Sequence, residues 1–329
     1  MDVLVFGAGA MGSVFGGFLS RKNNVTLVGR KNHIDAINEK GLTVSGIWGR
    51  HSFRGVQALE SADDIPKNTF FDLIMITVKS FDTAQAVEAV KPFVGDETAV
   101  MSMQNGIGNE EVIVKAVGAE HTMGGMAIFG ARLPEPGHAE VTVYAAPCRV
   151  GEIGGGRSAR AEKIAAVFTE TGIPAEASES IIRDKWMKAF YNIALNPLSA
   201  ILRVPYGELG KKEETRTVMK ALLKEAFAVA EAVGVSLDIT WDGYFQYLME
   251  KQLPPTASHI SSMLQDIERG RQTEIDYLNG AIVRLGGEKG VETPVNNLIT
   301  RYIKGLGASD SPTPAEMVKG LLDLSRKTV

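Results

Sequence analysis

The sequence predicts an α/β protein with a doubly wound sheet in its first half and an all-helical second half. Short, nearly all-apolar runs alternate with helical patterns through the first half, which is typical of parallel strands joined by crossover helices. Beyond about residue 181, strand signals almost vanish and apolar residues recur at helical spacing. We therefore expect two domains, 1–178 and 179–329, which suits a chain of 329 residues.

The first domain is expected to hold four buried parallel strands, each bounded by Gly, Asn, Asp or Lys. These runs are 3–6, 25–28, 73–77 and 98–101, with helical patterns at 11–20 and 83–90. We also expect a hairpin at 42–53, strands near 122–127, 139–144 and 149–152, and a helix at about 158–171.

In the second domain, helical stripes of apolar residues lie at 215–233 and 276–285. A helix through the apolar segment 186–195 should end at Asn196, because Pro197 disfavours helical geometry at the residue before it. A loose turn at 305–314 should precede a C-terminal helix.

Composition excludes several classes of protein. Apolar residues make up 44% of the chain and charged residues 22%, which argues against disorder. A net charge of −4 argues against a nucleic-acid partner. No apolar run is long enough to span a membrane, and the first residues lack a signal peptide's basic start. Cys148 is the single cysteine and no two of the five histidines are spaced as metal ligands, so we predict no metal site. The lack of membrane and signal segments, together with the single cysteine, predicts a soluble, cytoplasmic protein.

A glycine motif follows the first predicted strand and opens a helix. Its residues are Gly7-Ala8-Gly9-Ala10-Met11-Gly12. Gly7 allows a tight turn, Gly9 lets the backbone approach a pyrophosphate, and Gly12 lets the helix pack close to the strand. The free N–H groups at the helix start favour phosphate. The order strand, motif and helix predicts a Rossmann-type dinucleotide site.

The end of the second predicted strand bears on the choice of cofactor. NAD-binding folds usually place an acidic residue there to hold the ribose 2′-hydroxyl, and this chain has Val28-Gly29-Arg30-Lys31. Arg30 can pair with a 2′-phosphate, so we predict NADPH/NADP+; the competing interpretation is a solvated loop arginine. Two more polar loops, with Lys79 and with Asn105, follow predicted strands, at the sheet edge where such folds bind ligands. The competing interpretations are a surface lysine at Lys79 and a simple turn at Asn105-Gly106.

Three polar residues interrupt an otherwise apolar helix in the second domain. Lys188, Asn192 and Asn196 stand at i, i+4 and i+8, so they form one stripe on the helix. Buried lysine and asparagine need partners or a cavity, and such a row suits a small polar ligand. A snorkelling lysine on a capped helix is the alternative.

Two further candidates are Ser262 and Glu274. Ser262 and Gln265 are spaced as a capping box, and Thr273 has the pattern of a second N-cap. In one straight helix Ser262 and Glu274 would lie about 18 Å apart along the axis. We therefore expect a break at 269–271 and two helices that present both residues to one site, although two surface caps without a ligand would give the same spacing.

These motifs together resemble the ketopantoate reductases (2-dehydropantoate 2-reductases). The resemblance covers nearly the whole chain and is most specific in two stretches, 185–198 and 261–276. It implies a Rossmann domain followed by a helical substrate-binding and dimerisation domain. The implied reaction is NADPH-dependent reduction of 2-dehydropantoate to (R)-pantoate, on the route to pantothenate and coenzyme A. The expected partner is a small 2-oxo acid substrate, and the apolar-rich helices of the second half predict a homodimer.

The resemblance also implies residue roles. Lys188 would be the general acid, and Glu274 would orient it and contact the substrate hydroxyl. Asn105 and Ser262 would hold the substrate carboxylate, with Asn105 and Lys79 also beside the cofactor. The substrate's polar groups, including its hydroxyl, would be bound by Asn192 and Asn196.

One position departs from the family pattern. Tyr206 stands before Gly-Glu-Leu, where many members have an asparagine that contributes to the substrate site. A related reductase of another 2-oxo acid therefore stays an alternative. A 3-hydroxyacid dehydrogenase or pyrroline-carboxylate reductase would also place helices after a Rossmann domain, and an NADPH-sensing protein would keep Gly7–Gly12 and Arg30 without needing Lys188 or Glu274.

Overall fold

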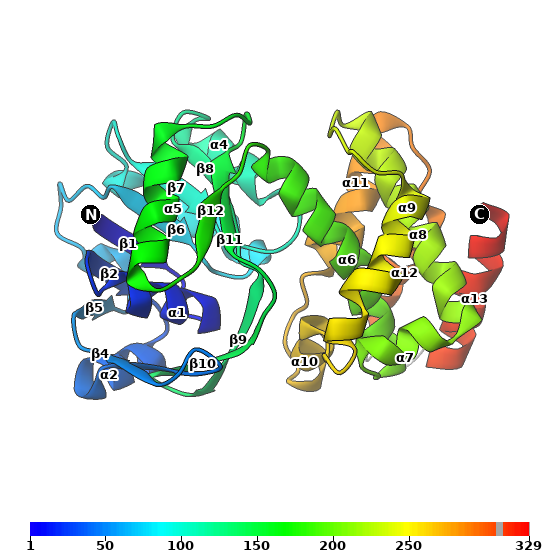
Figure 1. Ribbon diagram of the computed structural model, residues 1–329, viewed down its shortest axis with the longest axis horizontal. Coiled ribbons are helices and arrows are strands. Elements are labelled where there is room, and N and C mark those ends of the chain that lie inside the picture. The colour runs from blue at the N-terminus through cyan, green and yellow to red at the C-terminus, as the bar shows by residue number, and fades with distance from the viewer. Residues whose placement is uncertain (307–311, 329) are drawn as a thin grey trace. The chain divides into compact units, whose positions relative to one another are not determined.

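The computed structural model describes residues 1–306 and 312–328 and divides into two compact units (Figure 1). The units are Met1–Asp184 and Lys185–Val329, whereas the sequence placed the boundary at residue 178. The α/β architecture followed by helices is as predicted. Part of the turn expected at 305–314 lies outside the described residues.

An eight-stranded sheet forms the centre of the first unit, in the order β12-β11-β8-β7-β6-β1-β2-β5. Every neighbouring pair from β5 to β8 is parallel, and β11 runs antiparallel to β8. The strands are β1 (Asp2–Phe6), β2 (Asn24–Val28), β5 (Val56–Leu59), β6 (Leu73–Ile76), β7 (Ala99–Ser102), β8 (Thr122–Met126), β11 (Cys148–Glu152) and β12 (Ala175–Ala177).

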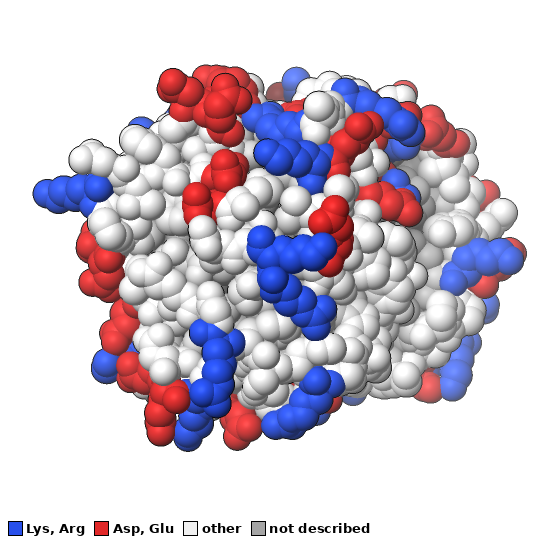
Figure 2. All heavy atoms as spheres, turned by 60° about the vertical axis from the view of Figure 1, so that its left-hand side comes forward, with Lys and Arg blue, Asp and Glu red and all other residues white. Residues whose placement is uncertain are grey.

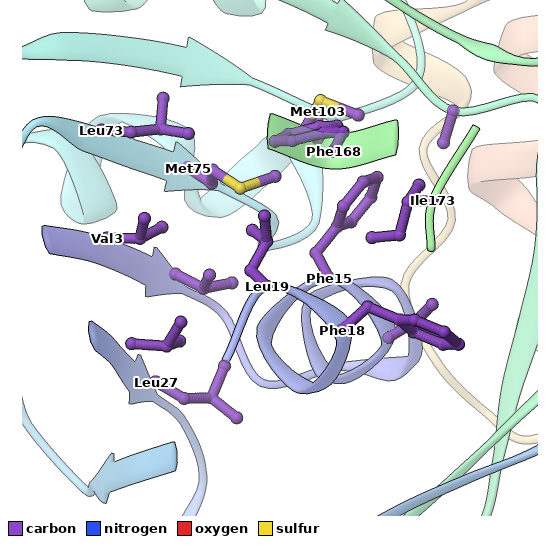
Figure 3. Close-up of a cluster of buried hydrophobic side chains, with 14 of the residues drawn as sticks. Val3, Phe15, Phe18, Leu19, Leu27, Leu73, Met75, Met103, Phe168 and Ile173 are labelled. Atoms are coloured by element: carbon purple, nitrogen blue, oxygen red, sulfur yellow. The ribbon is translucent and has the colours of Figure 1, made fainter. Parts of the chain in front are cut away.

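Helices cover both faces of this sheet, as doubly wound folds require. They are α1 (Ala10–Leu19), α2 (Lys31–Lys40), α3 (Thr83–Val90), α4 (Asn109–Val117) and α5 (Ala159–Thr171). Strand residues alternate between two cores: Val3 packs with α1 and α5, and Leu4 packs with α3 and α4. Figure 3 shows the first core, where the rings of Phe15 and Phe168 lie 5.4 Å apart.

A second, four-stranded sheet has the order β4-β3-β10-β9. Its strands are β3 (Leu42–Gly46), β4 (His51–Phe53), β9 (Phe129–Glu135) and β10 (His138–Tyr144). The hairpin predicted at 42–53 is confirmed as the antiparallel pair β3–β4. Strand β9 was not predicted, because its second half is exposed and carries Arg132, Pro134 and Glu135. Within the described part of the chain it is an edge strand paired with β10 alone, and such a strand tolerates proline and charged residues.

The second unit is built from helices. They are α6 (Ile181–Leu202), which begins just before the unit boundary, α7 (Tyr206–Lys211), α8 (Glu213–Ala232), α9 (Trp241–Tyr247), α10 (Ser262–Glu268), α11 (Asn279–Lys289), α12 (Pro294–Gly305) and α13 (Pro314–Thr328). A π-helical turn (Leu248–Gln252) continues α9. Among the described residues, no helix has the length and apolar character needed to cross a bilayer.

The predicted end of α6 at Asn196 is wrong, because the helix continues through Pro197 to Leu202. Proline cannot donate to the carbonyl four residues earlier, which is that of Ile193. Asn279 compensates, since its Nδ2 donates to Ile193 O at 3.2 Å. Asn279 also donates to Asn296 Oδ1 at 3.0 Å, and Asn296 is itself held by the buried Glu225.

Two helices separated by a break occupy the region from Ser262 to Leu285, as expected. The break follows α10, and Gly270 lies there in the left-handed region with φ 62°. The capping details differ from the prediction. Ser261, not Ser262, is the N-cap of α10 and accepts from Leu264 N at 3.0 Å, and α11 begins after Leu278 rather than at Thr273.

Candidate active site

Three loops of the first unit leave the same edge of the main sheet. Strands β7, β6 and β1 are parallel neighbours, so their carboxyl ends meet there. The glycine motif follows β1, the loop with Lys79 follows β6, and the loop with Asn105 follows β7. This is the edge at which open α/β sheets bind ligands.

The glycine motif combines close packing at two glycines with open space at the third. A Cβ atom at Gly7 would lie 2.6 Å from Val78 N, and one at Gly12 would lie 2.1 Å from Gly7 O, so both positions demand glycine. A Cβ atom at Gly9 would meet nothing within 4 Å. Gly9 is the N-cap of α1, with Ala8 before it and Ala10 and Met11 after it, so open space adjoins the helix N-terminus. These residues fit a dinucleotide pyrophosphate.

Arg30 and Lys31 differ in how far they are engaged. Lys31 pairs with Glu60 at 2.7 Å and with Asp35 at 3.4 Å. Arg30 is exposed at the N-cap of α2 and has no ion-pair partner among the described residues. Of the two, Arg30 is therefore the cation available to a 2′-phosphate.

A buried polar network, which the sequence reasoning missed, joins the loops after β6 and β7. Gln104 Nε2 donates to Val78 O at 3.0 Å and to Thr83 Oγ1 at 2.7 Å. Asn109 Nδ2 and Ser80 Oγ both donate to Asn105 O, at 2.9 and 3.0 Å. The network fixes the backbone of Asn105 while its side chain stays exposed. The signal was a cluster of polar residues flanking two strand ends.

The polar stripe of the second unit lies on α6, as predicted. Lys188 and Asn192 are half-buried, and Asn196 is only 4% exposed. Tyr206 Oη donates to Asn196 Oδ1 at 2.5 Å. Within the described part of the chain, the Asn192 side chain makes no hydrogen bond, so its amide is available to a ligand.

Two contacts tie the segments that carry Ser262 and Glu274 to this helix. Ser261 Oγ donates to Asn196 O at 3.4 Å, which places the start of α10 against α6. The bond from Asn279 to Ile193 does the same for the start of α11. Ser262 is exposed, and Glu274 is half-buried immediately before a 3-10 turn (Ile275–Tyr277).

The rings of Tyr191, Tyr206 and His259 pack together beside Asn196, the last residue of the stripe. Burial raises the pKa of Tyr191 to about 12 and the pKa of Tyr206 well above its usual value, so both are protonated at neutral pH. Burial lowers the pKa of His259, whose ring packs against Tyr206. In residues 1–306 and 312–328, no three His, Cys, Asp or Glu side chains gather as metal ligands would.

Comparison with known families gives the assignment. The model of ketopantoate reductase PanE/ApbA matches residues 3–155, and the model of its C-terminal region matches residues 180–307. The chain belongs to the ketopantoate reductase family. It is therefore an oxidoreductase, and the predicted family and reaction class are confirmed.

Relatives of the family align along nearly the whole chain. The 2-dehydropantoate 2-reductase of Aquifex aeolicus is 38% identical over 92% of this chain and 96% of its own length. The enzyme of Pyrococcus horikoshii is 35% identical, over 92% and 97%.

Solved structures agree with this assignment. A 2-dehydropantoate 2-reductase from Geobacter metallireducens superposes with a TM-score of 0.85 at 28% identity, covering 92% of this chain and 99% of its own. A D-mandelate dehydrogenase with NADH and anilino(oxo)acetate gives 0.82 at 29% identity, covering 99% of each. Since this last relative was solved with NADH, family membership alone does not choose between NADH and NADPH.

Proposed function

We propose that this ketopantoate reductase reduces 2-dehydropantoate to (R)-pantoate with NADPH, in pantothenate and coenzyme A biosynthesis. The observation that carries the proposal is the stripe of Lys188, Asn192 and Asn196 on α6, in a chain whose relatives are 2-dehydropantoate 2-reductases. A protein that only sensed the cofactor would have no use for this stripe.

The first unit supplies the groups that would hold NADPH, which brings the hydride to the reaction. Gly7–Gly12 and the N-terminus of α1 would take the pyrophosphate, and Arg30 the 2′-phosphate. Support comes from the space beside Gly9 and from the absence of an acidic residue at the end of β2. Lys79 and Asn105, on the adjacent loops after β6 and β7, would contact the cofactor at a distance from its pyrophosphate.

The second unit supplies the proton. Reduction of a 2-oxo carbon builds negative charge on its oxygen, and the Lys188 ammonium would stabilise that charge and then transfer its proton to it. A carboxylate at Glu274 would favour the charged form of the lysine and orient it. Half-burial of Lys188 suits this role, because an ion–oxyanion contact strengthens away from bulk water.

The substrate would be held by the remaining polar side chains. Asn105 and Ser262, both exposed, would bind its carboxylate, and Asn192 and Asn196 would bind its hydroxyl and carbonyl side. The apolar-rich helices of the second unit also support a homodimer. A single cysteine, Cys148, cannot form a disulfide within the chain, which supports the reducing cytoplasm as its location.

A related reductase of another 2-oxo acid is the second candidate, favoured by Tyr206 and by the similarity to a D-mandelate dehydrogenase. Steady-state NADPH oxidation with 2-dehydropantoate, trimethylpyruvate and phenylglyoxylate distinguishes the two. We expect the highest kcat/KM with 2-dehydropantoate and (R)-pantoate as the product. A higher value with phenylglyoxylate, or cofactor binding without oxidation of NADPH by any of the three, would refute the proposal.

A further inference from the structure

Tyr206 opens α7 and is almost completely buried, with 2% of its surface exposed. Its ring lies edge-on to that of Tyr191, with centroids 5.6 Å apart and an interplanar angle of 84°, and 5.2 Å from the ring of His259. Its backbone N–H donates to His259 O at 3.1 Å, and that of Gly207 donates to Ala257 O at 2.9 Å. The ring and the main chain are therefore both fixed.

The hydroxyl of this fixed ring reaches the polar stripe. It donates to Asn196 Oδ1 at 2.5 Å, and burial keeps it protonated as a donor. A phenol that donates leaves the amide only one orientation, with Oδ1 toward Tyr206 and Nδ2 on the opposite side.

The Nδ2 atom of the Asn196 amide remains available to a ligand. Asn196 is 4% exposed, and among the described residues its Nδ2 donates to no acceptor. Nδ2 is not one of the fully enclosed polar atoms that lack a partner in the described part of the chain, so a bound molecule can reach it and bring an oxygen lone pair to this donor.

We propose that Tyr206 is a positioning residue that holds Asn196 as a hydrogen-bond donor and thereby selects 2-oxo acids with an acceptor oxygen at that point. The inference rests on the proposed function, in which Asn196 binds the substrate. The terminal hydroxyl oxygen of 2-dehydropantoate can accept this bond, whereas trimethylpyruvate has the same carbon skeleton without that oxygen. Tyr206 thus affects substrate specificity without touching the substrate, because it orients the Asn196 side chain that makes the contact.

The test compares two variants that each lose one buried tyrosine hydroxyl. Tyr206→Phe removes the bond to Asn196. Tyr191→Phe is the matched control, because Tyr191 Oη donates instead to Thr256 Oγ1 at 2.8 Å, in the same aromatic cluster. For each protein, kcat and KM are measured with 2-dehydropantoate, with trimethylpyruvate and with varied NADPH.

We expect Tyr206→Phe to lower kcat/KM for 2-dehydropantoate by about three- to tenfold, mainly through KM, because one oriented hydrogen bond is weakened. The values for trimethylpyruvate and the KM for NADPH should change by less than about twofold, since neither depends on that bond. Tyr191→Phe should keep the wild-type selectivity ratio.

An equal loss on both substrates, or the same selectivity ratio in an active Tyr206→Phe enzyme, would overturn the role of Tyr206 alone. Failure of the wild-type protein to reduce 2-dehydropantoate would instead overturn the proposed function. If Tyr206→Phe does not fold, the selectivity ratio of Asn196→Asp is measured instead. This variant keeps the acceptor for Tyr206 and lacks the Nδ2 donor. Retained selectivity in Asn196→Asp would contradict the proposal.

Discussion

At the scale of single residues, the two adjacent cations after β2 differ in how they are engaged, and this difference underlies the proposed choice of NADPH. Arg30 is exposed at the end of β2 without an ion-pair partner among the described residues, while the neighbouring Lys31 is held by Glu60 and Asp35. The two adjacent cations therefore differ in their surroundings: Arg30 has no ion-pair partner among the described residues, and Lys31 is part of a surface ion-pair cluster. The sequence motif indicated Arg30, but only the structure separates it from Lys31.

Arg30→Asp should raise the KM for NADPH by about tenfold or more and lower the KM for NADH. The carboxylate would repel a 2′-phosphate and could accept from the 2′-hydroxyl of NADH. Lys31→Ala is the control and should change the NADPH/NADH ratio much less. Equal efficiency of the wild-type protein with the two cofactors would contradict this account of Arg30.

His33 links α1, α2 and the turn before β10 through an uncharged ring. Gly137 N donates to its Nδ1 at 3.0 Å, and Ser13 Oγ lies 2.9 Å from its Nε2. Burial lowers its pKa below the usual 6.5. As the pH falls below about 6.5, the unfolded chain takes up a proton that the folded chain resists, so stability decreases from there toward the lowered folded pKa.

Denaturant unfolding of the whole chain between pH 7.5 and about pH 5 should therefore show a falling free energy of unfolding, with at most about 1.4 kcal/mol per pH unit from this one residue. His33→Gln keeps a donor and an acceptor but cannot titrate, and should flatten that part of the curve. His259, which is also buried with a lowered pKa, should leave a residual slope. An identical curve for His33→Gln and wild type would exclude His33 as a contributor.

At the scale of elements, the turn from β1 into α1 joins tight packing to open space. Gly12 is confined by the carbonyl of Gly7, whereas the region beside Gly9 is open. The same motif therefore contains one glycine that the packing requires and another beside open space, where the proposed pyrophosphate would lie.

Gly12→Ala should destabilise the protein by roughly 2 kcal/mol or more, because its Cβ would overlap backbone that cannot move away. Gly9→Ala should fold with nearly wild-type stability and bind NADPH about tenfold more weakly, since its methyl group would occupy the phosphate position. Thermal denaturation and NADPH titration measure the two effects. Tight NADPH binding by a folded Gly9→Ala protein would show that the pyrophosphate lies elsewhere.

Helix α6 shows where local sequence rules were insufficient. Pro197 predicted a helix end, yet Asn279, 82 residues later, donates to the carbonyl that the proline leaves without its helical partner. This compensation depends on tertiary contact, which spacing rules do not include. Adjacent serines caused the other error, because either Ser261 or Ser262 could have been the N-cap and only the backbone geometry selects Ser261.

At the scale of the whole molecule, the strongly periodic parts of the chain were predictable and the non-local ones were not. Four of the parallel strands (β1, β2, β6 and β7) and α3 appear where their apolar runs predicted. Strand β5 and the edge strand β9 were missed, because short strands without clear alternation depend on their neighbours in the sheet. The stripe on α6 was predictable from helical spacing, whereas the bond from Tyr206 to Asn196 required the fold.

The central claim is that Lys188, on α6, donates the proton in a reduction whose cofactor is bound by the first unit. The most direct measurement is kcat of Lys188→Ala with 2-dehydropantoate, together with the Kd for NADPH. We predict a kcat lowered by about 10²–10⁴, as for loss of a positioned general acid, with an NADPH Kd within about twofold of wild type. A folded Lys188→Ala protein with nearly wild-type kcat would contradict the claim.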